Sequence, residues 1–345
     1  MHIIADVFGG DKPQEILYGI TLALKEHEDL KITACGDEHR IKELIAADKR
    51  TTKNASRYLE EGRFIILHAR DTITNDDEPT TAIKTKKESS LVKAFDLLTS
   101  SDEYTGMFSS GNTGAILTGG VLKIKRIKGV MRPTLCGILP TVNQGQGVAV
   151  ADIGANVDCL PQYLGQFARM SSIYMNSVYA VDSPRIGLLN VGTEDKKGDE
   201  LTHEAFKILK ADPTINFAGN MEARDYMSGK YDIVVADGFS GNVLLKAVEG
   251  TGKLVSGKLK GDVFSGFFGK LGAIMVMPGL KRLKTQMNYH SFGGATLLGL
   301  NKILVKAHGS CSSLAVEVIA RQITRMHKNN MVVRIGEAMK TETEQ

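Results

Sequence analysis

Short runs rich in β-branched and other apolar residues recur along the chain, and most are followed by apolar residues at helical spacing. The first run precedes GGDKP and then Ile16, Leu17, Ile20 and Leu24, with Pro13 suited to a first helical turn. The runs lie at His2–Val7, Lys31–Ala34, Phe64–His68, Tyr104–Phe108, Val148–Ile153, Arg185–Val191, Tyr231–Ala236 and Ile303–Ala307. Because parallel strands need helical crossovers, this alternation predicts an α/β fold whose mainly parallel sheet is covered on both faces.

The composition fits one large folded unit. The 345 residues are 42% hydrophobic and 24% charged, which supplies a sizeable core and excludes a largely disordered chain. No repeat, low-complexity tract or proline-rich linker divides the chain, so we expect a single α/β catalytic domain over residues 1–335 with soft internal boundaries. Residues 253–287 carry seven basic residues and one acid, and they stand out as a basic amphipathic insertion. Residues 336–345 are expected to form a polar, frayed tail.

Charge and cysteine content limit the partners and the compartment. The net charge of +4 gives no overall nucleic-acid signature, so we expect no nucleic-acid partner. The four cysteines lie far apart without a CxxC pair, which is typical of reduced thiols in a cytosolic protein. The N-terminus lacks the pattern of a signal peptide, and the longest apolar stretch, Leu271–Leu280, is far shorter than the ~20 residues of a membrane-spanning helix. We therefore expect a cytoplasmic protein.

Several common catalytic motifs are missing from the sequence. There is no P-loop signature, no GxGxxG after a predicted strand, no GxSxG nucleophile elbow and no HExxH. These absences argue against P-loop NTPases, ordinary Rossmann dehydrogenases, α/β-hydrolases and zincin proteases. No metal-ligand cluster stands out, so we expect no essential metal and no cofactor.

Three predicted strand-to-helix junctions are rich in glycine and small polar residues, and each could hold an anion. Free backbone N–H groups at a helix start can face an anion, and glycine lets it approach. Tight turns with helix caps would explain each junction separately. The polar candidates that capping does not require are Asn112, Asn242, Lys306 and His308. The remaining candidates at these junctions are Gly111, Thr113, Gly114, Asp237, Gly238, Gly241 and Ser310.

Acidic residues also follow predicted strands. Asp6 precedes Gly9 and Gly10, Asp152 precedes Asn156, and Asp237 precedes its glycine junction. Helix capping or loop hydrogen bonding would account for each acid alone. Because ligands of open α/β sheets bind at the carboxyl ends of the strands, their repetition suggests a polar pocket that orients a ligand.

Eight sequence blocks in order resemble the bacterial phosphate acyltransferase family, PlsX. They are D-x-x-GGD at Asp6–Asp11, SGNTGA at Ser110–Ala115, RPT at Arg132–Thr134, DIGANVD at Asp152–Asp158, RIGLLNVGTEDKKG at Arg185–Gly198, DGFSGN at Asp237–Asn242, FGGATLLG at Phe292–Gly299 and KAHGS at Lys306–Ser310. The chain departs from the family pattern at Phe8, Ser110, Ser240 and Cys311.

The resemblance implies transfer of a long-chain acyl group from acyl carrier protein to inorganic phosphate. The product would be an acyl phosphate, which a membrane glycerol-3-phosphate acyltransferase uses to begin phospholipid (phosphatidic acid) synthesis. The implied fold is a three-layer sandwich like that of isocitrate and isopropylmalate dehydrogenases, related to phosphate acetyltransferases. The family also implies a homodimer that acts peripherally at the inner face of the cell membrane, with the glycerol-3-phosphate acyltransferase as a candidate partner.

The candidate residues permit a mechanism without a covalent acyl-enzyme, because phosphate is itself the nucleophile. Backbone N–H groups of Gly111–Gly114 or Gly238–Asn242 would bind phosphate, and Lys306 or Lys246 would balance its charge. Asn112, Asn242 and His308 are candidates for the oxyanion contact, and His308 could protonate the departing pantetheine sulfur. A purely structural role for His308 stays open. Cys311 is the one thiol worth weighing as a nucleophile, but the resembled family tolerates Ser there.

Two basic segments have more than one interpretation. In residues 253–287, Phe264, Phe267, Phe268, Leu271, Ile274, Met275 and Met277 are interleaved with Lys258, Lys260, Lys270 and Lys281. This segment could bind anionic lipid, form the dimer interface or edge the acyl channel. The run Lys123–Arg132 could receive acidic acyl carrier protein or form a solvated helix face.

Three other functions remain open from the residues alone. A short-chain phosphotransacylase that uses coenzyme A would need the same phosphate site but no long acyl channel. A catalytically silent membrane-binding protein could retain the fold. A metal-dependent dehydrogenase is the third alternative, although no cofactor fingerprint supports it.

Overall fold

The computed structural model describes residues 1–143, 147–286 and 292–340, and at residues 260, 267–268, 270 and 280–286 it describes the backbone alone. The strands are β1 (His2–Asp6), β2 (Lys31–Gly36), β3 (Phe64–His68), β4 (Tyr104–Ser109), β5 (Thr134–Leu139), β6 (Val148–Ala151), β7 (Arg185–Asn190), β8 (Asn216–Glu222), β9 (Ile233–Val235), β10 (Ala295–Leu298) and β11 (Ile303–Lys306).

Helices fill most of the sequence between the strands. The α-helices are α1 (Pro13–Glu26), α2 (Glu38–Ala47), α3 (Lys49–Glu60), α4 (Pro79–Thr85), α5 (Ser90–Ser100), α6 (Thr113–Gly119), α7 (Pro161–Tyr179), α8 (Glu200–Ala211), α9 (Gly238–Lys258), α10 (Gly266–Gln286), α11 (Ser313–Lys328) and α12 (Met331–Lys340). Shorter helical turns are η1 (Gly120–Ile124), η2 (Ala223–Ser228) and η3 (Leu259–Val263).

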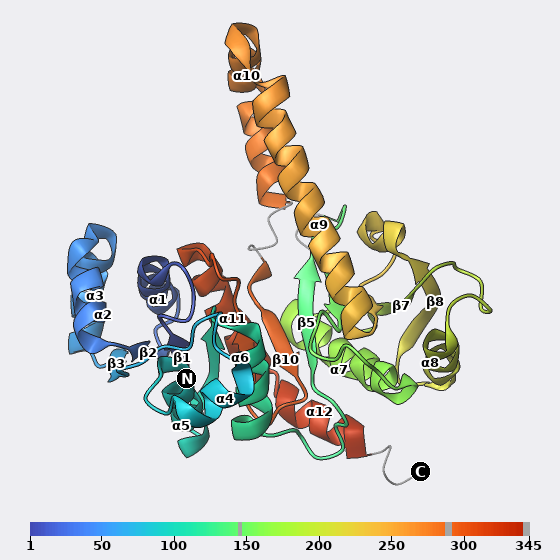
Figure 1. The fold of residues 1–345 in the computed structure, drawn as a ribbon, viewed down its shortest axis with the longest axis horizontal. Coiled ribbons are helices and arrows are strands. Elements are labelled where there is room, and N and C mark those ends of the chain that lie inside the picture. Colours follow the sequence, from blue (N-terminus) through green and yellow to red (C-terminus); the bar gives the residue numbers. More distant parts are fainter. Residues whose placement is uncertain (144–146, 287–291, 341–345) are drawn as a thin grey trace.

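The strands form one sheet in the order β3-β2-β1-β4-β11-β10-β5-β6-β9-β7-β8. Strands β3, β2, β1, β4 and β11 are parallel to one another, and so are β6, β9, β7 and β8. Between these blocks, β10 is antiparallel to both β11 and β5, and β5 is antiparallel to β6. The two parallel blocks therefore run in opposite directions, joined by β10 and β5 at the centre of the molecule (Figure 1).

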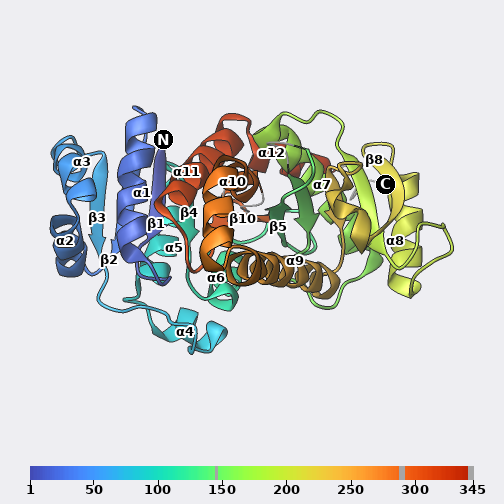
Figure 2. The ribbon, with the colours of Figure 1, turned by 90° about the horizontal axis from the view of Figure 1, so that it is seen from above.

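Helices cover both faces of the sheet. One hydrophobic cluster joins strand residues such as Ile3 and Val305 to helices α1, α7, α11 and α12. A second cluster uses the alternate strand residues, such as Ile4 and Leu304, and joins them to α5 and α6. Figure 2 shows the helices on the two sides of the sheet. The alternation of buried residues toward opposite faces makes this a three-layer α/β sandwich, which confirms the predicted fold class.

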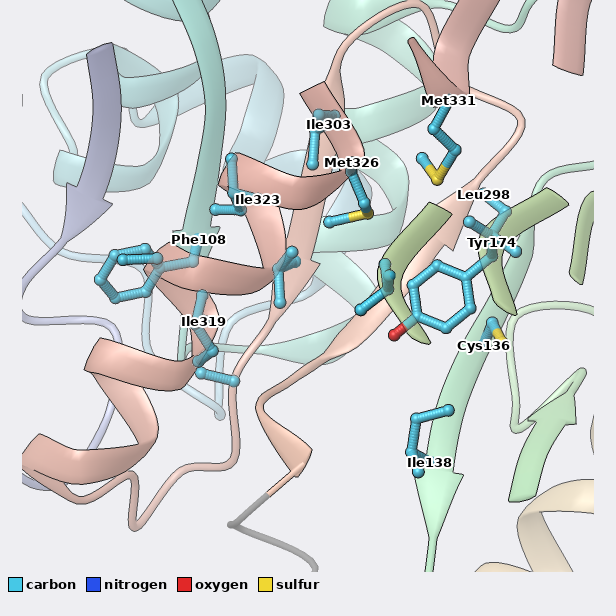
Figure 3. Close-up of a cluster of buried hydrophobic side chains, with 14 of the residues drawn as sticks. Phe108, Cys136, Ile138, Tyr174, Leu298, Ile303, Ile319, Ile323, Met326 and Met331 are labelled. Atoms are coloured by element: carbon cyan, nitrogen blue, oxygen red, sulfur yellow. The ribbon is translucent and has the colours of Figure 1, made fainter. Parts of the chain in front are cut away.

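The first cluster continues across the junction between the two parallel blocks. In Figure 3, Phe108 of β4 and Ile323 of α11 lie at one end, and Tyr174 of α7 and Cys136 of β5 lie at the other. A hydrogen bond between the Tyr174 hydroxyl and the Gln322 side chain (2.8 Å) lies within this contact. The two blocks thus share one core, and their facing edges are held at fixed positions.

All eight runs that the sequence singled out contain a strand. The strands that the sequence analysis did not identify are β5, β8 and β10. Two of these, β5 and β10, make every antiparallel pairing of the sheet. Their apolar sequences, TLCGIL and ATLL, are compatible with central strands, but short apolar runs carry no signal of strand direction.

Helices α9 and α10 project from the body as a long hairpin (Figure 1). Only the first turns of α9 are packed, and its buried residues are Gly238, Gly241 and Leu244. The segment predicted as an insertion begins within α9, and its last residue, Met287, lies outside the described residues. The side chains of Lys260, Phe267, Phe268, Lys270 and Lys281 also lie outside them.

Two further observations concern the ends and the length of the helices. Helix α12 continues to Lys340 and buries Met339, so it extends into the segment predicted as a polar tail. The last five residues of that segment, 341–345, are outside the described part of the chain. Among the described residues, no helix is both long and apolar enough to cross a membrane.

Candidate active site

A cavity of about 200 Å³ lies where the two parallel blocks meet. Three of the predicted junctions contribute side chains to it: Thr113 from the start of α6, Asn242 and Lys246 from α9, and Lys306 and His308 from the end of β11. Helix α9 starts after β9, in the other block, and its first turns carry Asn242 and Lys246 to the residues that follow β4 and β11. The cavity therefore collects groups that are up to 195 positions apart, from 113 to 308.

The remaining lining is mostly apolar. It consists of Leu135, Gly137, Ile138, Leu139, Ile153, Leu245, Glu249, Phe292, Gly293, Gly294, Ala295 and Ala307. The sequence analysis named none of these residues as candidates. Glu249 was detectable from its spacing, because it lies three positions after Lys246 on one helix. The apolar residues look like ordinary core residues in the sequence, and only the tertiary arrangement of β5, α9, β10 and the segments after β6 and β11 places them at a cavity.

Asp6 organises the loops on the β1 side of the site. Its carboxylate is buried and accepts hydrogen bonds from the hydroxyls of Ser90 and Ser109, each at 2.6 Å. Ser109 in turn accepts the backbone N–H of Gly111 at 3.1 Å. Burial raises the pKa of Asp6, while the two hydroxyl donors favour its charged form. Asp6 thus holds the start of the Gly111–Gly114 junction and does not line the cavity.

Glycines allow the same loops to pack against each other. A Cβ at Gly9 would overlap the Asp6 carboxylate, and a Cβ at Gly10 would overlap the Ser110 hydroxyl. The backbone N–H of Asp11 donates to the carbonyl of Gly309 at 3.0 Å, which ties this loop to the loop after β11. The glycines of the GGD block are therefore explained by close loop contact.

Asp152 plays the matching role in the other block. Its buried carboxylate accepts backbone N–H groups from Leu135 (3.0 Å), Gly154 (3.2 Å), Ala155 (3.1 Å) and Asn156 (2.7 Å). Burial raises its pKa, and hydrogen bonds from Ala155, Asn156 and Leu135 oppose that effect. The Asn156 side chain donates to the same carboxylate at 2.8 Å. This acid therefore shapes the loop after β6 and lies outside the cavity.

The start of α9 packs directly on this loop. Asp237 is the N-cap of the helix and accepts the N–H of Ser240 at 2.8 Å. The N–H of Gly238 donates to the carbonyl of Asn156 at 2.7 Å. A Cβ at Gly238 would overlap Asn156, and a Cβ at Gly241 would overlap the carbonyl oxygen of Asp152. These glycines let α9 approach closely enough for its next turn to reach the cavity.

Asn112 is occupied by structural hydrogen bonds. Its side-chain oxygen caps α6 by accepting the N–H of Ala115 at 3.0 Å. Its amide nitrogen donates to the carbonyls of Thr74 (3.1 Å) and Asp77 (3.3 Å). The side chain is buried and is not among the groups that line the cavity, whereas its neighbour Thr113 is. Asn112 thus positions the junction that presents Thr113.

His308 lines the cavity and is oriented by its own loop. Its Nδ1 accepts the backbone N–H of Ser310 at 3.2 Å, and the Ser310 hydroxyl lies 2.9 Å from the same nitrogen. Because the backbone N–H can only donate, Nδ1 is an acceptor and the neutral ring carries its proton on Nε2. The ring is therefore arranged as a hydrogen-bond donor through Nε2.

Among the residues that the structure describes, the charged groups that line the cavity are Lys246, Lys306 and Glu249. The pKa of Lys306 is lowered to about 8, mainly by burial and in smaller part by the nearby Lys246 cation. Lys246 forms an ion pair with Glu249 at 2.9 Å. With one acid against two basic groups, the cavity gains net positive charge when Lys306 is protonated, which suits an anion.

Cys311 lies in the same loop but is buried, and it is not part of the cavity lining. Burial raises the pKa of its thiol to about 12. The sequence raised the alternative that a helix start beside His308 lowers this pKa and makes the thiol reactive. The structure contradicts that lowering, because loss of hydration outweighs the opposing effect of Lys306.

The predicted site residues thus divide into two sets. Those that line the cavity are Thr113, Asn242, Lys246, Lys306 and His308. Those that lie behind it and shape or tie its loops are Asp6, Gly9, Gly10, Gly111, Asn112, Gly114, Asp152, Asn156, Asp237, Gly238, Gly241 and Ser310.

Comparison with known proteins identifies close relatives over the full chain. A family model described as "Fatty acid synthesis protein" matches residues 1–334. The chain is 42% identical over 343 residues to the phosphate acyltransferase of Bacillus subtilis (strain 168), with 99% of each chain covered. It is also 42% identical over 332 residues to the phosphate acyltransferase of Streptococcus sanguinis (strain SK36), with 96% of each chain covered.

Solved structures with a similar fold are more distant in sequence. A phosphotransacetylase from Streptococcus pyogenes matches with a TM-score of 0.59 and 16% identity, covering 95% of this chain and 94% of that one. The EutD phosphotransacetylase from Staphylococcus aureus matches with a TM-score of 0.58 and 14% identity, over the same shares of the two chains. At these identities the likeness concerns the fold alone, and it agrees with the predicted relation to phosphate acetyltransferases.

Proposed function

Because the chain belongs to the family of phosphate acyltransferases, we propose that it transfers a long-chain acyl group from acyl carrier protein to inorganic phosphate. The products are free acyl carrier protein and an acyl phosphate, which a membrane glycerol-3-phosphate acyltransferase would use for phosphatidic acid synthesis. The observation that carries the proposal is the cavity in which Lys306, Lys246, Thr113, Asn242 and His308 converge.

The two lysines bind phosphate in this proposal. Removing phosphate from water is costly, and fixed positive charge in a partly enclosed site offsets that cost. Lys306 is suited to the task because it lies at the end of a central strand, where its position is fixed. The Thr113 hydroxyl at the start of α6 supplies a neutral hydrogen-bond donor from the junction after β4, whose Ser109 pairs with Lys306 of β11.

The reaction is a direct displacement at the thioester carbonyl. A phosphate oxygen forms a bond to the carbonyl carbon, and the electron pair of the C=O bond moves onto oxygen as the tetrahedral species forms. When the C=O bond returns, the carbon–sulfur bond breaks and its electron pair leaves with sulfur. Asn242 and His308 are the candidates for stabilising the oxyanion. The neutral His308 ring can donate a hydrogen bond through Nε2 to the departing sulfur, and the proton that the thiolate gains is the one that hydrogen phosphate loses as it becomes acyl phosphate.

The size of the cavity limits what it encloses. Small-molecule sites usually measure roughly 300–1,000 Å³, and this cavity is about 200 Å³. It therefore suits phosphate and the thioester group and leaves the long acyl chain outside. The apolar lining from Ile138, Leu139, Leu245 and Phe292 marks the side on which the acyl chain leaves.

The α9–α10 hairpin is proposed to attach the enzyme peripherally to the inner face of the cell membrane or to pair with a second copy. Beyond the packed first turns of α9, its described exposed apolar residues are Leu254, Val255, Val263, Leu271, Ile274, Met275, Val276 and Met277. Such residues along a projecting hairpin favour an apolar partner. Vesicles of anionic phospholipid should bind the parent protein. They should not bind the double variant Ile274→Asp/Met275→Asp. If that variant still binds vesicles but becomes monomeric, the hairpin serves dimerisation.

The activity is tested with palmitoyl-acyl carrier protein, inorganic phosphate and hydroxylamine to trap the acyl phosphate. We expect phosphate-dependent release of free acyl carrier protein by the parent and by His39→Ala, a control at an exposed histidine of α2. The release should be lost in folded His308→Ala. Turnover of acetyl-coenzyme A without turnover of palmitoyl-acyl carrier protein would support a short-chain phosphotransacylase instead, and the absence of both activities would contradict the proposal.

A further inference from the structure

A second cavity, of about 390 Å³, lies beside α6 on the same face of the sheet. Its wall comes from α4, α6, η1, the segment just before β5, the loop after β6, and β10. The lining residues are Thr80, Lys84, Leu117, Thr118, Val121, Leu122, Arg132, Pro133, Ala155, Asn156 and Leu297. Its volume falls within the roughly 300–1,000 Å³ typical of small-molecule sites. None of the residues proposed above to perform the reaction belongs to it.

The two cavities follow one another along shared elements. On α6, the lining passes from Thr113 in the first cavity to Leu117 in the second, about one helical turn or ~6 Å farther. On β10 it passes from Ala295 to Leu297, two strand residues or about 7 Å farther. The two cavities are therefore neighbours, and the offset between their linings is short compared with an extended acyl-thioester ligand.

A thioester bound in the first cavity has two substituents that must extend out of it. One is the acyl chain on the carbonyl carbon, and the other is the pantetheine that carries the sulfur. The apolar wall formed by Ile138, Leu139 and Phe292 suits the acyl chain. The second cavity is mixed, because Leu117 and Leu297 alternate with hydroxyl, amide and cationic groups. A phosphopantetheine arm has the same mixture of apolar and polar groups, since it combines two amides and a dimethyl carbon with a phosphate at its far end.

The charge of the second cavity also fits a phosphate. Lys84 and Arg132 both line it, and no acidic side chain is among the described residues of its wall. Both side chains are exposed, so they stand at the mouth where the far end of the arm would emerge. Arginine and lysine together are the usual protein partners of a phosphate group.

We propose that the second cavity binds the phosphopantetheine arm of acyl carrier protein, with Lys84 and Arg132 contacting its phosphate. The inference rests on the proposed function, because it specifies how the acyl donor of that reaction is held. The surface beside the mouth bears Lys125, Arg126 and Lys128, all exposed. This basic surface complements an acidic carrier protein and steers its approach.

The test measures binding in the absence of inorganic phosphate, so it does not depend on turnover. Isothermal titration compares S-octanoyl-phosphopantetheine with S-octanoyl-pantetheine, which lacks only the phosphate. In Lys84→Gln/Arg132→Gln, the Kd of the phosphorylated ligand should rise about tenfold, and the Kd of the other ligand should change less than twofold. The control is Lys87→Gln, an exposed lysine just beyond α4 that does not line the cavity, and it should bind both ligands like the parent.

Two results overturn the inference: a parent that does not prefer the phosphorylated ligand, and a double variant that weakens both ligands equally or neither. The proposed function fails separately, through the absence of phosphate-dependent turnover in a parent that still binds the arm. A double variant that binds S-octanoyl-phosphopantetheine more weakly but keeps full binding of holo acyl carrier protein would also overturn the assignment, because it would place the carrier's arm elsewhere.

Discussion

Phosphate binding is predicted to weaken as Lys306 loses its proton. Burial lowers the pKa of this lysine to about 8, so the group is mostly charged at pH 7.5 and mostly neutral at pH 9. With that pKa, the protonated fraction falls from about three quarters to about one tenth over this range. If only the protonated form binds phosphate, the apparent Kd rises as the reciprocal of that fraction, about eightfold. Inorganic phosphate is mainly a dianion throughout, so its own charge changes little.

The assay is isothermal titration of inorganic phosphate at pH 7.5 and pH 9. Lys306→Arg should bind phosphate with nearly equal affinity at both values, because arginine stays protonated. Lys25→Arg, at an exposed lysine of α1, should keep the eightfold change. The reasoning is refuted by a parent whose Kd changes less than twofold, or by a Lys306→Arg variant that weakens as steeply as the parent.

Three further predictions concern single substitutions. His308→Ala should lower kcat about a hundredfold with little change in unfolding free energy, because it removes a hydrogen-bond donor to the oxyanion and the departing sulfur; unchanged kcat would remove the residue from the mechanism. Asn112→Ala should cost about 2 kcal/mol of stability in urea unfolding, since it loses a helix cap and two hydrogen bonds, whereas the exposed Asn242→Ala should cost activity and less than about 0.5 kcal/mol. Equal stability of the two would contradict the structural role of Asn112. Gly241→Ala should destabilise the protein by roughly 1–3 kcal/mol in thermal unfolding because its Cβ overlaps a carbonyl, while Gly250→Ala in the same helix meets nothing within 4 Å and should stabilise it slightly; the opposite order would refute the packing argument.

The fold class could be predicted from local pattern, but the strand directions could not. The runs at β1, β4 and β11 are each followed by helical spacing, which fixes parallel crossovers within one block. Strands β5 and β10 set the two blocks in opposite directions through pairs such as Thr296 with Cys136. That pairing joins residues 160 positions apart, and no feature of either short run specifies it.

The sequence predicted which strand-to-helix junctions form the site. It did not predict which residues of those junctions line the cavity and which only shape the loops. Glycine and small polar residues at strand ends identified the segments that carry Thr113, Asn242 and His308. The sequence could not show that Asn112 points away from the cavity, because its partners Thr74 and Asp77 come from a distant loop. Burial likewise shifts the pKa values of Lys306 and Cys311. The burial of each side chain depends on the whole tertiary structure.

In the proposed mechanism, one cavity holds phosphate beside the thioester. The most direct measurement is a crystal structure with inorganic phosphate and a non-hydrolysable thioether analogue of the acyl donor. We expect phosphate within hydrogen-bonding distance of Lys306, with the analogue's sulfur next to His308. Phosphate bound at another place, with Lys306 and His308 touching neither ligand, would contradict it.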